Sequence, residues 1–209
     1  MNFSEKEIMS LRDKIKPYMS ERRYAHTLEV ERAAVRIGEI LMPDRVNELR
    51  AATLLHDVAK DLPEAEQISL IKSYDSGATD EDLNMPPVLH SFAAPMIVMR
   101  DFPEYATEPI LSAVKSHTLG EVGMTLFAEI VFLADYIEDT RKHDSCKSTA
   151  KFVYSNLSIK KSQKENAAII HRAVKMSIEN TVKHLNMRSQ SVNSRTIATL
   201  EYIISVLNS

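Results

Sequence analysis

Four histidines and two aspartates carry the strongest chemical signal in this sequence. They are His26, His56, Asp57, His90, His117 and Asp135. His56 and Asp57 are adjacent inside the apolar run Leu54–Lys60, and burying either side chain without a partner costs about 2–7 kcal/mol or more. A bound metal ion would remove this cost, and mixed imidazole and carboxylate donors favour iron, manganese or zinc over calcium or magnesium. We therefore interpret the six residues as one metal site.

Each of these residues has a simpler explanation when it is taken alone. A single histidine on an apolar helix face is more often a hydrogen-bonded core residue, and Asp135 alone could cap a helix or pair with a cation. Several unpaired polar groups facing one core are hard to tolerate without a cation, so the combination favours the metal site. The sequence has no G-x-S-x-G motif, and nothing around Cys146 marks it as a nucleophile.

Helix signals distribute the candidate ligands over an all-α fold. A capping box at Ser4 opens a first helix, and Ser20 caps a second helix that carries His26. Up to residue 145 we expect helices over about residues 5–16, 21–41, 44–60, 63–74, 87–100, 108–117 and 125–140. Because bundles build cofactor sites from side chains on facing helices, these elements would bring the ligands together.

Prolines indicate where the expected helices end. The helix from about Asp44 is expected to continue through Lys60. Asp61 should then cap the next helix, with Pro63 in its first turn. Pro95 should kink its helix or end it early, because proline removes a backbone hydrogen bond.

The length and composition fit a helical core with an appended C-terminal part. The 209 residues include 4 glycines and no tryptophan, which favours helix over sheet. Residues 75–86 form the longest expected loop. We assign residues 1–145 to the core and 146–209 to an extension packed on it. The extension should contain two or three helices, the last capped by Asn193 or Ser194.

Charge is distributed unevenly along the chain. Residues 1–140 carry 14 basic and 25 acidic side chains, whereas residues 141–209 carry 12 and 4. This pattern favours a basic helical tail that packs on an acidic body or a second subunit; the alternative is a contact surface for polyanions. Cys146 is the single cysteine, the start lacks a signal peptide's apolar core, and the longest uncharged stretch, 83–99, is short for a membrane span. We expect a cytoplasmic protein without a membrane or nucleic-acid partner.

Five blocks of the sequence resemble the HD-domain phosphohydrolases in order and spacing. They are Arg22–His26, Leu54–Lys60, Leu89–Ser91, Lys115–Gly120 and Leu133–Arg141. His90 and His117 resemble the additional histidines of members that hold two metals, and the similarity is greatest to the YqeK-type family. That family hydrolyses diadenosine tetraphosphate symmetrically to two ADP with iron. Ser91, Leu119 and Asp139 depart from the family pattern, and none of them is a predicted ligand.

The resemblance implies a two-metal site. It assigns one ion to His26, His56, Asp57 and Asp135 and the second to His90 and His117, with Asp57 bridging the pair. Two such ions would activate a hydroxide as the nucleophile, so that no side-chain base is needed. The resemblance further implies iron (manganese or zinc being compatible with the ligands), a nucleotide substrate and a homodimer.

Cationic and polar side chains near the ligands are candidates for substrate contacts. They are Arg23, Lys60, Thr118, Gly120 and Arg141. Lys60 is expected to neutralise a phosphate and to be catalytic together with Asp57, and guanidinium forks match phosphate oxygens. An exposed helix face explains Arg23 equally well, and an ordinary turn explains residues 118–120. His143, His171 and His184 are expected to face solvent.

The expected function is symmetrical hydrolysis of diadenosine tetraphosphate, and two alternatives stay open. The same site could act on another nucleotide, such as a guanosine alarmone or a cyclic dinucleotide. A non-catalytic, metal-stabilised adaptor that binds RNA through its basic tail is the other alternative. Turnover measured across a panel of nucleotides distinguishes a hydrolase of diadenosine tetraphosphate from a hydrolase of another nucleotide. The variant His56→Ala tests the adaptor, because an adaptor that lost His56 would still bind RNA.

Overall fold

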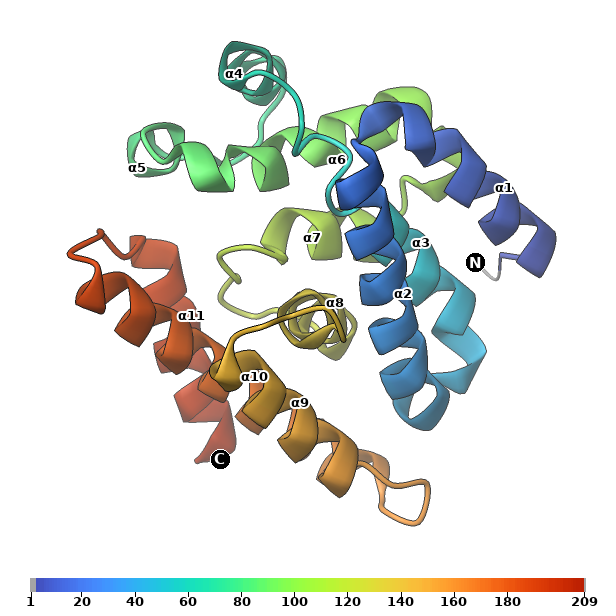
Figure 1. Cartoon of the computed structure of the whole chain (residues 1–209), viewed down its shortest axis with the longest axis vertical. Helices are drawn as coiled ribbons and strands as arrows, with labels where there is room; N and C mark the ends of the chain where they lie inside the picture. The colour runs from blue at the N-terminus through green and yellow to red at the C-terminus, as the bar shows by residue number, and fades with distance from the viewer. Residues whose placement is uncertain (1–2, 209) are drawn as a thin grey trace.

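Helices account for all regular secondary structure between residues 3 and 208, the part of the chain that the computed structural model describes. The α-helices are α1 (Glu5–Ile15), α2 (Glu21–Leu41), α3 (Val46–Leu55), α4 (Glu64–Lys72), α5 (Asp80–Leu83), α6 (Leu89–Asp101), α7 (Glu108–Ser116), α8 (Leu126–Ile137), α9 (Asp144–Asn156), α10 (Gln163–Met187) and α11 (Ser194–Leu207). Short 3-10 helices lie at η1 (Lys16–Tyr18), η2 (Pro43–Arg45), η3 (Pro86–Val88) and η4 (Pro103–Tyr105). The all-α prediction is confirmed (Figure 1). Within residues 3–208 no helix is both long and apolar enough to cross a membrane.

The predicted caps at the start of α1, α2 and α11 are confirmed. The Ser4 hydroxyl accepts a hydrogen bond from the Glu7 N–H, and the Glu7 carboxylate accepts one from the Ser4 N–H at 2.7 Å. The Ser20 hydroxyl accepts from the Arg23 N–H, and Asn193 is the residue that caps α11. These side chains satisfy N–H groups that have no partner within the helix.

The helix that carries the HD pair ends earlier than predicted. α3 stops at Leu55, and the expected continuation to Lys60 is wrong. The Lys60 N–H bonds to the Asp57 carbonyl three residues back at 2.9 Å, which is turn geometry. The His56 ring lies with Nδ1 2.5 Å from the Thr53 carbonyl, which in a continued helix would bond the Asp57 N–H. The side chain therefore competes with the backbone where the helix ends.

The expected cap at Asp61 and the expected early end of the helix at Pro95 are both wrong, whereas the alternative of a kink at Pro95 stays a prediction. Pro63 itself is the N-cap of α4, and Asp61 accepts a hydrogen bond from the Ser20 N–H at 2.8 Å instead of capping that helix. Pro95 does not end α6, which continues to Asp101. Pro95 and its neighbours are buried, so packing of α6 outweighs the missing backbone bond.

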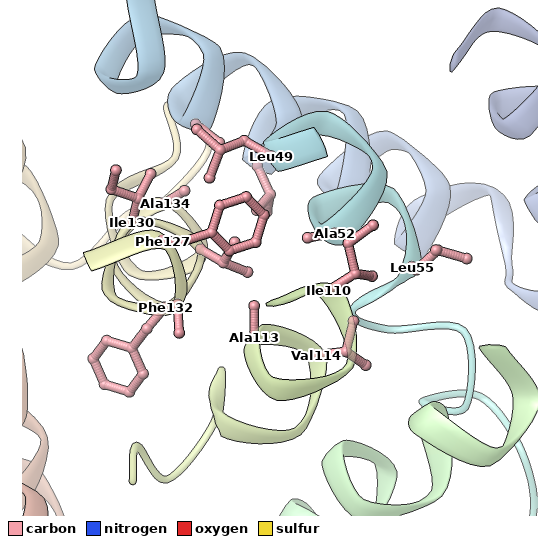
Figure 2. Close-up of a cluster of buried hydrophobic side chains, with 14 of the residues drawn as sticks. Leu49, Ala52, Leu55, Ile110, Ala113, Val114, Phe127, Ile130, Phe132 and Ala134 are labelled. Carbon is pink, nitrogen blue, oxygen red and sulfur yellow. The ribbon is translucent and has the colours of Figure 1, made fainter. Parts of the chain in front are cut away.

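The core lies between α3, α7 and α8. α3 and α7 each pack against α8, and α2 covers both α3 and α8. Leu49 and Ala52 of α3, Ala113 of α7, and Phe127 and Ile130 of α8 are all buried in this core (Figure 2). This apolar packing fixes the ends of α3, α7 and α8 relative to one another, and these ends carry several candidate ligands.

The C-terminal helices complete the same core. α10 packs on α8 and α9, and α11 packs on α10, on the opposite side of α8 from α2 and α3 (Figure 1). Ile170, Val174 and Ile203 are buried in one hydrophobic cluster with residues of α1–α8. The division into residues 1–145 and 146–209 stays a prediction.

The start of α11 makes hydrogen bonds and an ion pair with the segment that was predicted as a long loop. That segment, residues 75–86, contains the short helix α5 with a capping box between Thr79 and Asp82, so the prediction of a loop is wrong for residues 80–83. Asn193 donates to one oxygen of buried Asp82 at 2.9 Å, and Arg195 pairs with the other at 3.0 Å. Thr196 donates to the Leu119 carbonyl at 3.2 Å. α11 therefore holds both residues 75–86 and the turn after α7.

Candidate metal centre

Asp57 lies at the centre of the predicted ligands, in the turn that follows α3. It is buried, and its two oxygens face different histidines. Oδ2 lies 3.3 Å from His56 Nε2 and 3.8 Å from His26 Nε2. Oδ1 lies 3.3 Å from His90 Nε2 and 3.6 Å from His117 Nε2. One carboxylate thus joins two groups of imidazoles.

The first group contains His26, His56 and Asp135, which come from three elements. His26 lies inside α2, His56 ends α3, and Asp135 lies near the end of α8. His26 Nε2 is 3.0 Å from Asp135 Oδ1, and the two imidazole rings of the group are 5.8 Å apart. Atoms offered by these three residues lie close enough together to hold one metal ion.

The second group contains His90 and His117. His90 is in the first turn of α6 and His117 follows the last residue of α7. Their Nε2 atoms are 3.1 Å apart, and the Thr118 hydroxyl lies 3.1 Å from the first and 3.0 Å from the second. Thr118, predicted as a phosphate contact, is therefore placed directly at the imidazoles.

Backbone carbonyls orient two of the histidines. The Nδ1 atom of His56 lies 2.5 Å from the Thr53 carbonyl, and Nδ1 of His117 lies 2.6 Å from the Val114 carbonyl. An Nδ1–H that donates to a carbonyl leaves Nε2 with its lone pair, which is the form that binds a metal. At the C-terminal ends of both α3 and α7, the histidine Nδ1 thus contacts the carbonyl of the residue three positions earlier.

The ligand set fits a transition metal. Among the described residues, Nε2 of His26 and of His56 are buried without a hydrogen bond of normal geometry, although carboxylate oxygens lie 3.0 and 3.3 Å away. Two atoms that bind one ion at about 2.1 Å are separated by about 3.0–3.4 Å, so these spacings match shared coordination. Buried unpaired nitrogens are costly, and a cation removes that cost.

The electrostatics favour the metal-binding forms of Asp57, Asp135 and His90, whereas at His56 the charges of Asp57 and Asp135 outweigh burial and raise the pKa. Burial by itself opposes ionisation of Asp57, but His56 and His117 outweigh it and hold the pKa of the carboxyl well below its usual value. Burial opposes ionisation of Asp135 too, yet the His26 hydrogen bond and the Arg141 charge keep its pKa low. Burial, reinforced by neighbouring His117, lowers the pKa of His90. Anionic carboxylates and neutral imidazoles are the forms that bind metals.

Two predicted arginines contact the ligand carboxylates. Arg23 Nη1 lies 2.7 Å from Asp57 Oδ2, and Arg141 Nη2 lies 2.6 Å from Asp135 Oδ1. Both side chains are partly exposed and line a groove of about 740 Å³ that reaches His26. This volume is within the range of small-molecule sites.

Lys60 and Gly120 both make hydrogen bonds within the chain. Lys60 Nζ donates to the Pro87 carbonyl at 3.0 Å and lies 3.1 Å from His90 Nδ1, and burial lowers the pKa of this lysine. The Gly120 N–H donates to the Ser116 carbonyl at 2.8 Å, so this group is already used within the chain. Their roles toward a substrate stay predictions.

His171 was expected to face solvent, but it does not. His143 and His184 are exposed, as predicted. His171 of α10 is half-buried, and its Nδ1 lies 2.7 Å from the carboxylate of Glu129 in α8. The apolar stripe of α8 gave no sign that one of its carboxylates is buried.

Glu138 is a site residue to which the sequence reasoning assigned no role. α8 ends at Ile137, short of the predicted Thr140, and Glu138 is buried directly after it, 3.4 Å from His26 Nδ1. The available sequence signal is its spacing of three residues after Asp135.

Comparison with known proteins places this geometry in a family. The HD-domain family model matches residues 23–140, which contain all six predicted ligands. The chain is 30% identical over 191 residues to the symmetrical bis(5'-nucleosyl)-tetraphosphatase of Bacillus subtilis, covering 91% of this chain and 94% of the relative. The enzyme of the same name from Halalkalibacterium halodurans is 28% identical over 192 residues, with 91% and 93% covered.

A solved structure shares the whole fold. It is that of a predicted HD superfamily hydrolase involved in NAD metabolism from Clostridium acetobutylicum, with a TM-score of 0.80 and 27% identity. The match covers 99% of this chain and 100% of the other. The chain therefore belongs to the HD-domain hydrolases, in the YqeK-type family of symmetrical bis(5'-nucleosyl)-tetraphosphatases.

Proposed function

We propose that this protein hydrolyses diadenosine tetraphosphate at its central anhydride to give two ADP. The observation that carries the proposal is the position of Asp57, whose two oxygens face separate histidine groups. Relatives of 30% and 28% identity over nine-tenths of the chain carry the name of this activity. The reaction adds one water across the bond and needs no further reactant.

The proposed ligands divide into two sets that share Asp57. The first ion would be held by His26, His56, Asp57 and Asp135, and the second by His90, His117 and Asp57. When bound, a pair of divalent metals supplies Lewis acidity toward phosphate oxygens and lowers the pKa of water. The fixed rings of His56 and His117 supply preorganised nitrogen donors to this pair.

The cationic side chains would bind and orient the polyphosphate. Arg23 and Arg141 lie where the groove meets the ligands, and their planar guanidinium groups suit phosphate oxygens. Lys60 would add positive charge beside His90. Thr118 is positioned to donate a hydroxyl hydrogen bond next to His90 and His117. Charge that is already oriented stabilises the transition state without reorganisation.

The decisive experiment combines metal analysis with product identification. The protein is purified without oxygen, its metal content is measured, and diadenosine tetraphosphate is hydrolysed in ¹⁸O-enriched water. Central cleavage gives two ADP, one of which carries the label on its terminal phosphate. ATP plus AMP, or a stronger preference for a guanosine alarmone, a cyclic dinucleotide or a mononucleotide in the same panel, overturns the proposal.

The proposed enzyme is a cytoplasmic homodimer that uses iron. The ligand chemistry supports a transition metal, and the family resemblance supports iron within that class. Reconstitution of metal-free protein with ferrous, manganous or zinc ions tests the metal, and activity should be highest with ferrous iron. Light scattering of the purified protein tests the dimer, and a monomeric mass would contradict it.

A further inference from the structure

Glu138 lies behind the first ligand group and is not itself a predicted ligand. It directly follows α8, and its side chain is 1% exposed. A buried carboxylate is costly unless it is paired and hydrogen-bonded. Its partners therefore indicate what the residue does.

The Glu138 carboxylate is fixed by its own loop. The Thr140 N–H donates to Oε2 at 2.6 Å, and the Thr140 hydroxyl donates to Oε1 at 2.8 Å. Arg141 Nε lies 3.4 Å from Oε1, and the same guanidinium group contacts Asp135. Oε1 is thereby held 3.4 Å from Nδ1 of His26.

His26 needs a side-chain acceptor that His56 and His117 do not need. His56 and His117 end their helices and donate Nδ1–H to a carbonyl three residues back. His26 lies inside α2, where the carbonyls of the preceding turn accept backbone N–H groups. An acceptor for its Nδ1–H must therefore come from another element, and Glu138 is the residue at that position.

We propose that Glu138 is a positioning residue that accepts the Nδ1–H of His26 and so directs Nε2 at Asp57 and Asp135 as a metal donor. The inference rests on the proposed function for the identity of the reaction, but not for metal binding itself. A carboxylate behind a ligand histidine fixes its tautomer and ring orientation and raises its basicity. Through Thr140 and Arg141, the same carboxylate orders the rim of the groove.

The chain offers a matched control for this role. Glu129 is also a buried carboxylate of the α8 region, and it contacts His171 Nδ1 at 2.7 Å, away from the ligands. Glu129→Gln removes a buried carboxylate–imidazole pair without touching the metal centre. It therefore separates a general loss of packing from a loss of ligand positioning.

The test measures metal binding directly and uses Mn²⁺ alone as the probe. Glu138→Gln should weaken Mn²⁺ binding about 10- to 100-fold in calorimetric titration of metal-free protein, because the amide no longer favours the Nδ1–H tautomer. Turnover at limiting Mn²⁺ should fall similarly and recover in part at excess Mn²⁺. Glu129→Gln should bind Mn²⁺ as the native protein does.

Two outcomes overturn the proposal. One is native Mn²⁺ affinity in Glu138→Gln. The other is an equal loss of affinity in Thr140→Val, which keeps the His26 contact and removes a loop hydrogen bond, because loop order alone would then explain the effect. If native protein binds Mn²⁺ but does not cleave diadenosine tetraphosphate, the proposed function fails while the titrations still decide the role of Glu138.

Discussion

The two sides of Asp57 are built in different ways. On one side, His26 projects from the middle of α2 and Asp135 from the last turn of α8; their side chains are 13% and 23% exposed, and His26 lines the groove. On the other side, His90 and His117 lie at helix ends, and their side chains are 3% and 1% exposed. One carboxylate thus joins an open half, where a substrate can enter, to a closed half. Changes on the open side should alter activity first, and changes around the closed side should also alter stability.

Loss of the shared carboxylate should have the largest effect, because it acts on both halves. Asp57→Asn should lower kcat about 10³-fold or more, since metal ions supply several kcal/mol of transition-state stabilisation. Turnover and metal content of the variant are measured together. Asp61→Asn is the control, because Asp61 lines the groove but is not among the ligands. Near-native turnover in Asp57→Asn would show that the two halves do not depend on this residue.

Chemical rescue should distinguish the open half from the closed half. His26→Gly and His117→Gly should both lose turnover, and added imidazole should restore it in part for His26→Gly alone. His26 borders the groove, so free imidazole reaches its place, whereas His117 is buried. The readout is turnover against imidazole concentration. Equal rescue of both variants would mean that the closed half is accessible after all.

The stability of the closed half should depend on the contact between α11 and the turn that follows α7. Gly120 has a φ of +75°, and a Cβ there would lie 2.6 Å from Thr199 Cγ2. Left-handed backbone costs a non-glycine residue about 1–2 kcal/mol, and overpacking adds about 1–3 kcal/mol. Gly120→Ala should therefore lower the free energy of unfolding by about 2–5 kcal/mol in urea titrations.

A second glycine in the same turn isolates the packing contribution. Gly123 has a φ of +80°, but nothing lies within 4 Å of a Cβ built there. Gly123→Ala should lower the free energy of unfolding only by the cost of a left-handed backbone at alanine, about 1–2 kcal/mol. Equal losses in the two variants would show that α11 does not restrain this turn.

The six candidate ligands could be predicted from sequence because burying an unpaired histidine or aspartate among apolar residues costs free energy. His56 and Asp57 stand in a buried run, and the caps at Ser4 and Ser20 are local signals read correctly from a few neighbouring residues. Local patterns of this kind specify where helices begin. They were sufficient to predict the all-α fold, whereas the family was predicted from the resemblance of five sequence blocks to the HD-domain phosphohydrolases.

The features that sequence did not predict depend on contacts between distant residues. Glu138 and His26 are 112 positions apart, and Glu129 and His171 are 42 apart, so no local pattern links them. The early end of α3 depends on a side chain competing for a backbone carbonyl, and Pro95 is tolerated because α6 is buried. Packing outweighed local propensity at Pro95, whereas at the end of α3 a local side-chain hydrogen bond did so.

The last effect we predict depends on pH and lies at the hydrogen bonds between Asp82 and the start of α11. Burial alone would raise the pKa of Asp82, but hydrogen bonds from Thr79, Asn193 and Arg195 outweigh it and lower the pKa. A carboxyl whose pKa is lower in the folded state stabilises the protein above its unfolded pKa, about 3.9, and loses that contribution as the pH falls through the folded value.

Asp82→Asn should therefore cost about 1–3 kcal/mol of the free energy of unfolding near neutral pH, where charge-assisted hydrogen bonds are lost. Below about pH 4 the native protein loses the same contribution, so the difference between the two proteins should shrink. Urea titrations from about pH 7 to about pH 3 measure it, and Asp75→Asn, at an exposed position of the same segment, should show no such trend. A difference that stayed constant with pH would assign the role of Asp82 to shape rather than charge.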